Sequence, residues 1–111
     1  MKKFVALYLA PMSAVEQMRK ATPEQMKTGM DAWKKWMDEH KKALTELGAP
    51  LGKTKRITTS GVSDTRNEVT GYSVVQAETH EAAAKIFEGH PHFRMPGASI
   101  EVMEAMPIPG M

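Results

Sequence analysis

The first segment of the chain is apolar at nearly every position. Residues 2–10 read Lys-Lys-Phe-Val-Ala-Leu-Tyr-Leu-Ala, so hydrophobic side chains fall on both faces of an extended chain. This pattern predicts a strand that is buried on both sides and ends at Pro11. A short helical turn over residues 14–20 is expected to follow.

The longest periodic segment begins at Thr22. This residue can cap a helix, Pro23 suits the first helical position and Gln25 can complete a capping box. Apolar residues then recur at spacings of mostly three and four, at Met26, Met30, Trp33, Met37, Leu44 and Leu47. The spacing predicts one helix of about seven turns that ends at Gly48. Gly29, inside this helix, indicates a kink or a close packing contact.

The second half of the chain reads as three strands and one helix. Thr79 can cap the helix and Gly89 can end it. In chain order we expect a strand over 53–60 anchored by Ile57, a polar hairpin connection over 61–68, a strand over 69–78, a helix over 80–88 and a last strand over 99–106. The order β-α-β-β-α-β predicts an α+β, ferredoxin-like fold, in which two helices cover one face of a four-stranded antiparallel sheet.

The doubly apolar first strand also bears on oligomeric state. The sheet face that the helices leave open carries too many apolar residues to meet water, and a second copy of the chain is the simplest cover. We therefore expect a homodimer of the dimeric α+β barrel type. The domain should span residues 1–106, followed by an extended tail over 107–111 that contains Pro107 and Pro109.

The amino-acid composition argues against several classes of function. The 111-residue chain has a net charge of +2, and its basic and acidic residues are interspersed, which argues against nucleic acid as a partner. It contains no cysteine, so disulfides, thiolate catalysis and cysteine-based zinc sites are excluded, and we expect a cytoplasmic protein. No apolar run approaches the ~20 residues that span a bilayer, so we expect no membrane insertion.

His40 is the first candidate for chemistry. It occupies a position of the helical stripe that the apolar residues leave free, where an imidazole could act as an acid or a base near neutral pH. Asp38 and Glu39 are weaker candidates for its partner, because they are too close in sequence to share its helical face. The alternative is a histidine at the edge of the core, satisfied by a backbone carbonyl or by water.

Two further groups could form a site. Trp33 and Trp36 could wall a pocket for a flat ligand together with Tyr72 and His92, although tryptophans at this spacing are more often core residues. His90 and His92, separated by Pro91, could ligate a metal if a third ligand joined them, from Glu88, Glu101 or His40. The alternative for this segment is a stiff loop between helix and strand.

The order of several short motifs resembles the YCII-related (DGPF-like) family. The motifs are Ala49-Pro50-Leu51-Gly52, Gly61-Val62-Ser63-Asp64 and Val69-Thr70-Gly71-Tyr72-Ser73-Val74-Val75, with Trp33 and Trp36 upstream and Pro91-His92 before Ser99-Ile100-Glu101-Val102. The Asp-Gly-Pro-Phe tetrapeptide itself is absent. The resemblance implies a ferredoxin-like fold that dimerises as an α+β barrel, and a His–Asp pair in a cleft between helix and sheet in some relatives.

The sequence therefore favours a dimeric small-molecule-binding domain with a pocket between the long helix and the sheet. Whether it catalyses a reaction, with His40 as the acid–base residue, is left open by the residues, and no motif indicates a cofactor. The alternatives are a non-catalytic structural or interaction dimer, and a histidine-based metal binder.

Overall fold

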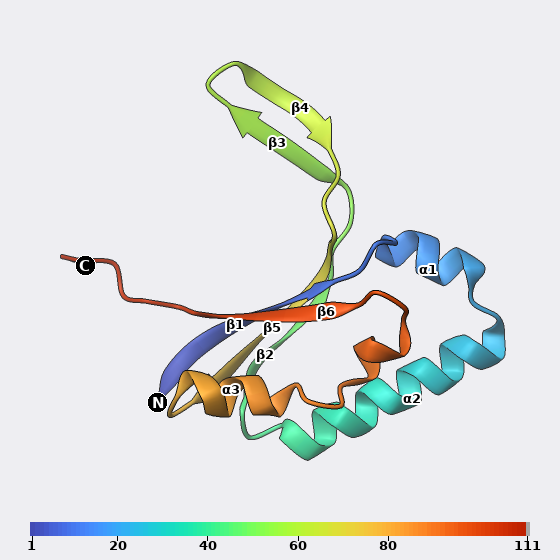
Figure 1. The fold of residues 1–111 in the computed structure, drawn as a ribbon, viewed down its shortest axis with the longest axis horizontal. Helices are drawn as coiled ribbons and strands as arrows, with labels where there is room; N and C mark the ends of the chain where they lie inside the picture. The colour runs from blue at the N-terminus through green and yellow to red at the C-terminus, as the bar shows by residue number, and fades with distance from the viewer. Residues whose placement is uncertain (111) are drawn as a thin grey trace.

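The four main strands form one antiparallel sheet in a computed structural model that describes residues 1–110 (Figure 1). The strand order is β2-β5-β1-β6, which is the order of a ferredoxin-like α+β fold. The elements are β1 (Lys2–Leu9), α1 (Ala14–Lys20), α2 (Pro23–His40), β2 (Leu44–Pro50), β3 (Thr54–Thr58), β4 (Gly61–Thr65), β5 (Val69–Ala77), α3 (His80–Ile86), the 3₁₀ turn η1 (Pro91–Arg94) and β6 (Ser99–Glu104). The predictions for β1, α1, β5, α3 and β6 are confirmed to within two residues at each end.

The core lies between the sheet and the helices α2 and α3. Alternate residues of β1, namely Phe4, Ala6 and Tyr8, face the helices and are buried. The other buried members of this core are Val75 and Ala77 of β5, Trp36 of α2, and Ala83 and Phe87. The indole Nε1–H of Trp36 donates to the carbonyl of Ile86 at 3.1 Å, which joins α2 to the end of α3.

The opposite face of the sheet is apolar at its centre. Val5 and Leu7 of β1 point to this side, where Val5 lies beside Val74 and Met103, and Leu7 beside Tyr72 and Glu101. The helices α2 and α3 lie on the other side of the sheet (Figure 1). The first strand was predicted to be buried on both faces; it is buried on the face toward the helices, whereas Val5 and Leu7 on the other face are half-buried.

The end of the long helix differs from the prediction. α2 stops at His40, and residues 44–50 form β2 at the edge of the sheet instead of two further helical turns. Leu44 belongs to the apolar stripe, but it lies opposite Val75 as a strand residue. Gly29 also differs, because a Cβ added there would meet nothing within 4 Å, so no close contact requires glycine.

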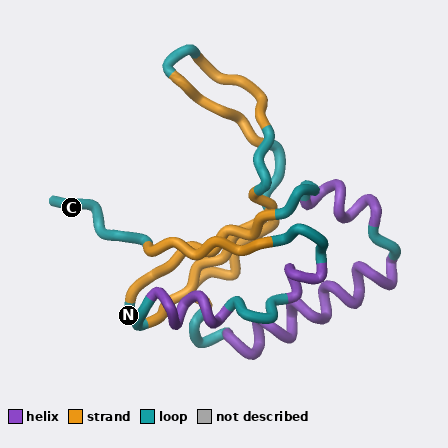
Figure 2. The backbone as a smooth tube through the Cα atoms, in the orientation of Figure 1, coloured by secondary structure: helices purple, strands orange, loops and turns teal. Residues whose placement is uncertain are grey.

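Residues 53–60 were expected in the main sheet, and this was wrong. β3 and β4 form a separate two-stranded hairpin that projects from the body (Figure 2), and β2 takes the expected place beside β5. The hairpin connection was predicted over 61–68, and its first part, residues 61–65, is itself a strand. Ile57 lies opposite Val62 on this hairpin, and the two side chains are 76% and 65% exposed.

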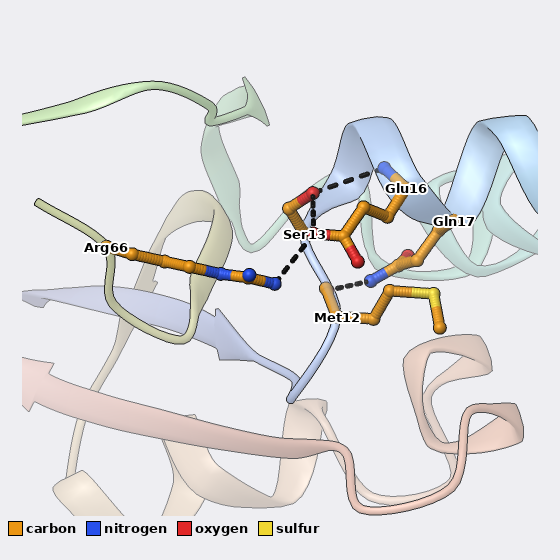
Figure 3. Close-up of polar contacts among 5 residues, drawn as sticks. All are labelled: Met12, Ser13, Glu16, Gln17 and Arg66. Carbon is orange, nitrogen blue, oxygen red and sulfur yellow. Dashed lines mark hydrogen bonds and ion pairs between the residues drawn. The ribbon is translucent and has the colours of Figure 1, made fainter.

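The base of the hairpin is attached to the start of α1 (Figure 3). Ser13 caps α1 by accepting from the backbone N–H of Glu16 at 3.1 Å, and Gln17 donates to the carbonyl of Met12 at 2.7 Å. The Glu16 carboxylate accepts from the Arg66 guanidinium at 2.7 Å, just beyond the end of β4. These contacts fix where the hairpin leaves the sheet. No helix within residues 1–110 is long and apolar enough to cross a membrane.

Candidate functional site

The segment His90-Pro91-His92 places two imidazoles on the face of the sheet that α2 covers. Gly89 ends the α3 region with a φ of +71°, a conformation that favours glycine, and Pro91 starts η1. His90 is the N-cap of η1, and its Nδ1 accepts from the backbone N–H of His92 at 2.9 Å. The Nε2 of His92 donates to the carbonyl of Leu9 at 2.8 Å, which ties η1 to the end of β1.

Aromatic rings from four parts of the chain surround His90. Its ring centroid lies 4.4 Å from that of Trp33 and 4.3 Å from that of Trp36, both at steep interplanar angles. The Tyr8 ring lies 5.1 Å from His90 and 5.4 Å from His92. We call this group the aromatic cluster; its members are Tyr8, Trp33, Trp36, Phe87, His90 and His92.

His90 differs from the other members of the aromatic cluster in its hydrogen bonding. Its side chain is 1% exposed, and its Nε2 is the buried side-chain polar atom that has no hydrogen-bond partner among the described residues. Burial, followed by the neighbouring His92 and His40, lowers the pKa of His90 to about 3. The ring is therefore neutral at physiological pH. Because its Nδ1 accepts a hydrogen bond, the proton of the neutral ring sits on Nε2.

Tyr8 belongs to the sheet, and its ring contacts both histidines of the cluster. Its hydroxyl donates to the Ser73 hydroxyl at 2.8 Å, and Ser73 donates in turn to the carbonyl of Leu47 at 2.9 Å. Burial raises the pKa of Tyr8 to about 12, so the phenol stays protonated. The chain Tyr8–Ser73–Leu47 fixes the ring against which His90 and His92 pack.

The structure brings together three of the four predicted ligand-binding residues. Trp33, Trp36 and His92 lie in the aromatic cluster, with Trp33 half-buried at its edge. Tyr72 lies on the opposite face of the sheet, beside Leu7, so it cannot line the same pocket. Its hydroxyl donates to the Glu46 carboxylate, and this hydrogen bond raises the pKa of Tyr72.

His40 lies next to the cluster at the end of α2. Its ring centroid is 5.0 Å from that of Trp36, and its Nδ1 donates to the backbone carbonyl of Trp36 at 2.9 Å. Asp38 and Glu39 are exposed, and neither forms a hydrogen bond or ion pair with His40. His40 is thus half-buried and oriented by its own helix rather than by a carboxylate.

The arrangement does not favour the metal site that the His-Pro-His segment suggested. The Nδ1 of His90 and the Nε2 of His92 are both engaged with the backbone. Within residues 1–110, no group of three or more His, Asp or Glu side chains is placed to hold a metal ion. A metal would need a third ligand and the loss of a backbone hydrogen bond.

Two open grooves lie beside the helices α2 and α3. One, of about 540 Å³, runs between α3 and β6 and is lined by residues that include His80, Phe87, Phe93, Ile100 and Val102. The other, of about 380 Å³, lies between α2 and β2 and is lined by Lys34, Met37, Asp38, Lys41 and Leu47. The first groove reaches the aromatic cluster, because Phe87 lines the groove and its ring lies 6.1 Å from that of His90.

The strand order, the antiparallel sheet and the helices on one of its faces place the chain in the α+β class with ferredoxin-like topology. No family model and no curated protein matches it. Among solved structures it is similar to 5-chloro-2-hydroxyhydroquinone dehydrochlorinase (TftG) from Burkholderia phenoliruptrix AC1100 in complex with 2,5-dihydroxybenzoquinone. The TM-score is 0.50, with 14% sequence identity over 91% of each chain. This likeness shows a related fold.

Proposed function

We propose that the chain is a homodimeric small-molecule-binding domain of the YCII-related, dimeric α+β barrel type. Residues 1–106 form the domain, residues 107–111 extend from it, and the cytoplasm is its compartment. The ligand binds beside the aromatic cluster between α2 and the sheet, where Phe87 joins the cluster to the groove between α3 and β6. His40, at the margin of the cluster, is the residue that we propose for proton transfer on the bound ligand.

The unpartnered Nε2 of His90 carries the proposal of a ligand site. Leaving a buried donor without an acceptor costs about 1–3 kcal/mol, and native proteins rarely keep such a group without a purpose. Here the donor lies among the rings of Trp33, Trp36 and Tyr8, which are suited to contact a flat molecule. The groove that meets the cluster at Phe87 gives a flat ligand an apolar surface to contact beside this group.

The open face of the sheet supports the dimer. Val5, Leu7 and Val74 form an apolar centre on a face that carries no helix (Figure 1). A second copy would bury this centre, as faces of this kind are covered in other antiparallel sheets.

The dehydrochlorinase of related fold holds a flat, oxygen-bearing ring, which supports a ligand of this general shape.

Calorimetric titration with a small set of flat aromatic probes tests the binding site. We expect acetophenone or phenol to bind the wild-type protein, and Trp33→Ala to weaken that binding by about tenfold, because it removes a ring that contacts His90. Tyr72→Phe is the matched control, since Tyr72 lies on the other face of the sheet. Equal loss in both variants, or no binding of any probe, would contradict the proposed site and favour a structural dimer module.

A further inference from the structure

We propose that the hairpin of β3 and β4 is an arm that contacts a second copy of the chain, and that the arm and the open sheet face form one continuous dimer interface. The inference rests on the homodimer proposed above and names a second surface that holds it together. It follows from the position of the hairpin, from its one-sided apolar pattern and from its charge.

The hairpin extends away from the covered side of the sheet. In Figure 1 it leaves the ends of β2 and β5 and projects away from α2 and α3. Its two strands pair with each other and not with the main sheet. The radius of gyration is 15.6 Å, whereas a compact domain of 111 residues has about 13 Å. The hairpin is therefore in a position to reach a second copy that lies on the open face.

The base of the hairpin is fixed to the body of the molecule. The Arg66 guanidinium donates to the Glu16 carboxylate at 2.7 Å, and the backbone N–H of Ala10 donates to the carbonyl of Glu68 at 2.8 Å. Lys53, directly before β3, has a φ of +50°, a conformation that residues other than glycine rarely adopt. The fold thus sets the direction of the hairpin, so the arm need not be ordered from a flexible state when it meets a partner.

One face of the hairpin is apolar toward its tip. Ile57 and Val62 lie directly opposite each other, so their side chains share a face, and both are exposed. The next pair on this face is the ion pair of Lys55 and Asp64, whereas Ser63 points to the other face. A two-stranded hairpin is only marginally stable in water by itself. The Ile57–Val62 pair is therefore placed for a contact that a single copy does not supply.

Charge favours a second copy of this chain as the occupant. Residues 53–66 contain four basic residues and one acidic residue, and their positive charge exceeds what their ion pairs neutralise. The open sheet face carries the exposed carboxylates of Glu46 and Glu101, while Lys3 lies at the end of β1 that is remote from the hairpin. Two open faces that meet would bring the carboxylates of both copies together, and the basic arms would offset their repulsion.

A carboxylate on either face of the arm tests the contact. In Ile57→Glu the apolar pair is lost and a negative charge approaches an acidic surface, so the dimer Kd in sedimentation velocity should rise at least about tenfold. Ser63→Glu is the matched control, because it adds the same charge to the other face of the hairpin, and it should change the Kd by less than about threefold. Both residues are exposed in a single copy, so neither substitution disturbs the core.

Hydrogen exchange tests the arm without changing it. The amides of β3 and β4 should exchange at least about tenfold more slowly in the wild-type dimer than in Leu7→Lys, which carries its substitution on the sheet and leaves the hairpin sequence intact. Wild-type protein diluted below its dimer Kd gives the same comparison without a substitution. Equal exchange in the dimer and in the monomer would overturn the proposal.

The outcomes separate the arm from the homodimer. If Leu7→Lys dissociates the dimer and Ile57→Glu does not, the open face joins the copies and the arm proposal is wrong. If Ile57→Glu and Ser63→Glu raise the Kd equally, the apolar face of the hairpin is not the contact, and the arm proposal is again wrong. If the wild-type protein is a monomer in sedimentation velocity, the homodimer and the arm are both wrong.

Discussion

At the scale of single residues, His90 opposes the stability of the fold. A histidine that is buried, neutral and unpartnered at one nitrogen gives the folded state a lower proton affinity than the unfolded chain. Its other nitrogen contributes in the opposite sense, by capping η1 through the His92 N–H. The residue therefore positions the segment while leaving one buried donor without a hydrogen-bond partner among the described residues.

The pKa of His90 predicts acid sensitivity. The folded pKa of about 3 lies below the ordinary value of 6.5, so the unfolded chain binds more protons between these two values. The neutral His90 ring imposes no protonation cost on folding well above pH 6.5, and the free energy of unfolding declines as the pH falls through 6.5 toward 3. The His90 contribution should lower the free energy of unfolding by about 2 kcal/mol between pH 8 and pH 5. Urea denaturation of the wild-type protein and of His90→Asn at these two pH values measures it.

The substitution isolates His90 from the other histidines. His40, His80 and His92 are present in both proteins, so their titration largely cancels in the comparison. His90→Asn should show the smaller loss of stability at pH 5, by the same ~2 kcal/mol. An equal loss in the two proteins would show that His90 is already accessible to protons in the folded state.

The sequence predicted some of the residues that the structure brings together in the aromatic cluster. Trp33, Trp36 and His92 could be selected from their residue type and spacing, and the structure brings them together. Tyr8 was missed and Tyr72 was chosen in its place, because both tyrosines lie on strands and only the register decides which face each one takes. The burial of His90 likewise depends on Tyr8, which is remote in sequence and is brought near by folding.

At the scale of secondary structure, the boundary between α2 and β2 shows how tertiary pairing overrides helical spacing. Leu44 and Leu47 continue the apolar stripe of α2, and nothing local forbids a longer helix. The backbone of residues 44–50 instead completes the edge of the sheet beside β5, where Leu44 can still face the core. Met26 and Met30, at the other end of the stripe, are exposed. Spacing alone could not reveal either outcome.

Two glycines test these assignments, Gly29 the interior of α2 and Gly48 the strand β2. Gly29 lies inside α2 with open space around it, so Gly29→Ala should stabilise the protein by about 1 kcal/mol. Gly48 in β2 has a φ of +79°, and an added Cβ would lie 1.7 Å from the carbonyl oxygen of Tyr72. Gly48→Ala should destabilise the protein by more than about 3 kcal/mol, as measured by urea denaturation. A cost near 1 kcal/mol at Gly48 would instead fit a helix that continues to Leu47.

At the scale of the whole molecule, the two sides of the sheet are unequally covered. The helices bury Phe4, Ala6 and Tyr8 on one side, while Val5 and Leu7 on the other are only half-buried. The hairpin of β3 and β4 extends beyond the sheet (Figure 2). Its side chains Ile57 and Val62 are exposed. An isolated two-stranded hairpin is marginal in water, so this projection adds to the apolar surface that a second copy could cover.

The dimer is tested by placing a charge at the centre of the open face. Leu7 pairs with Tyr72 on one side and Glu101 on the other, and its side chain points away from the helices. In a homodimer built on this face, Leu7→Lys would bury two unpaired ammonium groups near the interface centre, one from each copy. The substitution should raise the dimer Kd by at least about 100-fold, equivalent to roughly 3 kcal/mol, as measured by sedimentation velocity. Met30→Lys is the control, because it adds the same charge on the exposed side of α2. A dimer that survives Leu7→Lys and dissociates on Met30→Lys would place the interface on the helices, and the open sheet face would then need another partner.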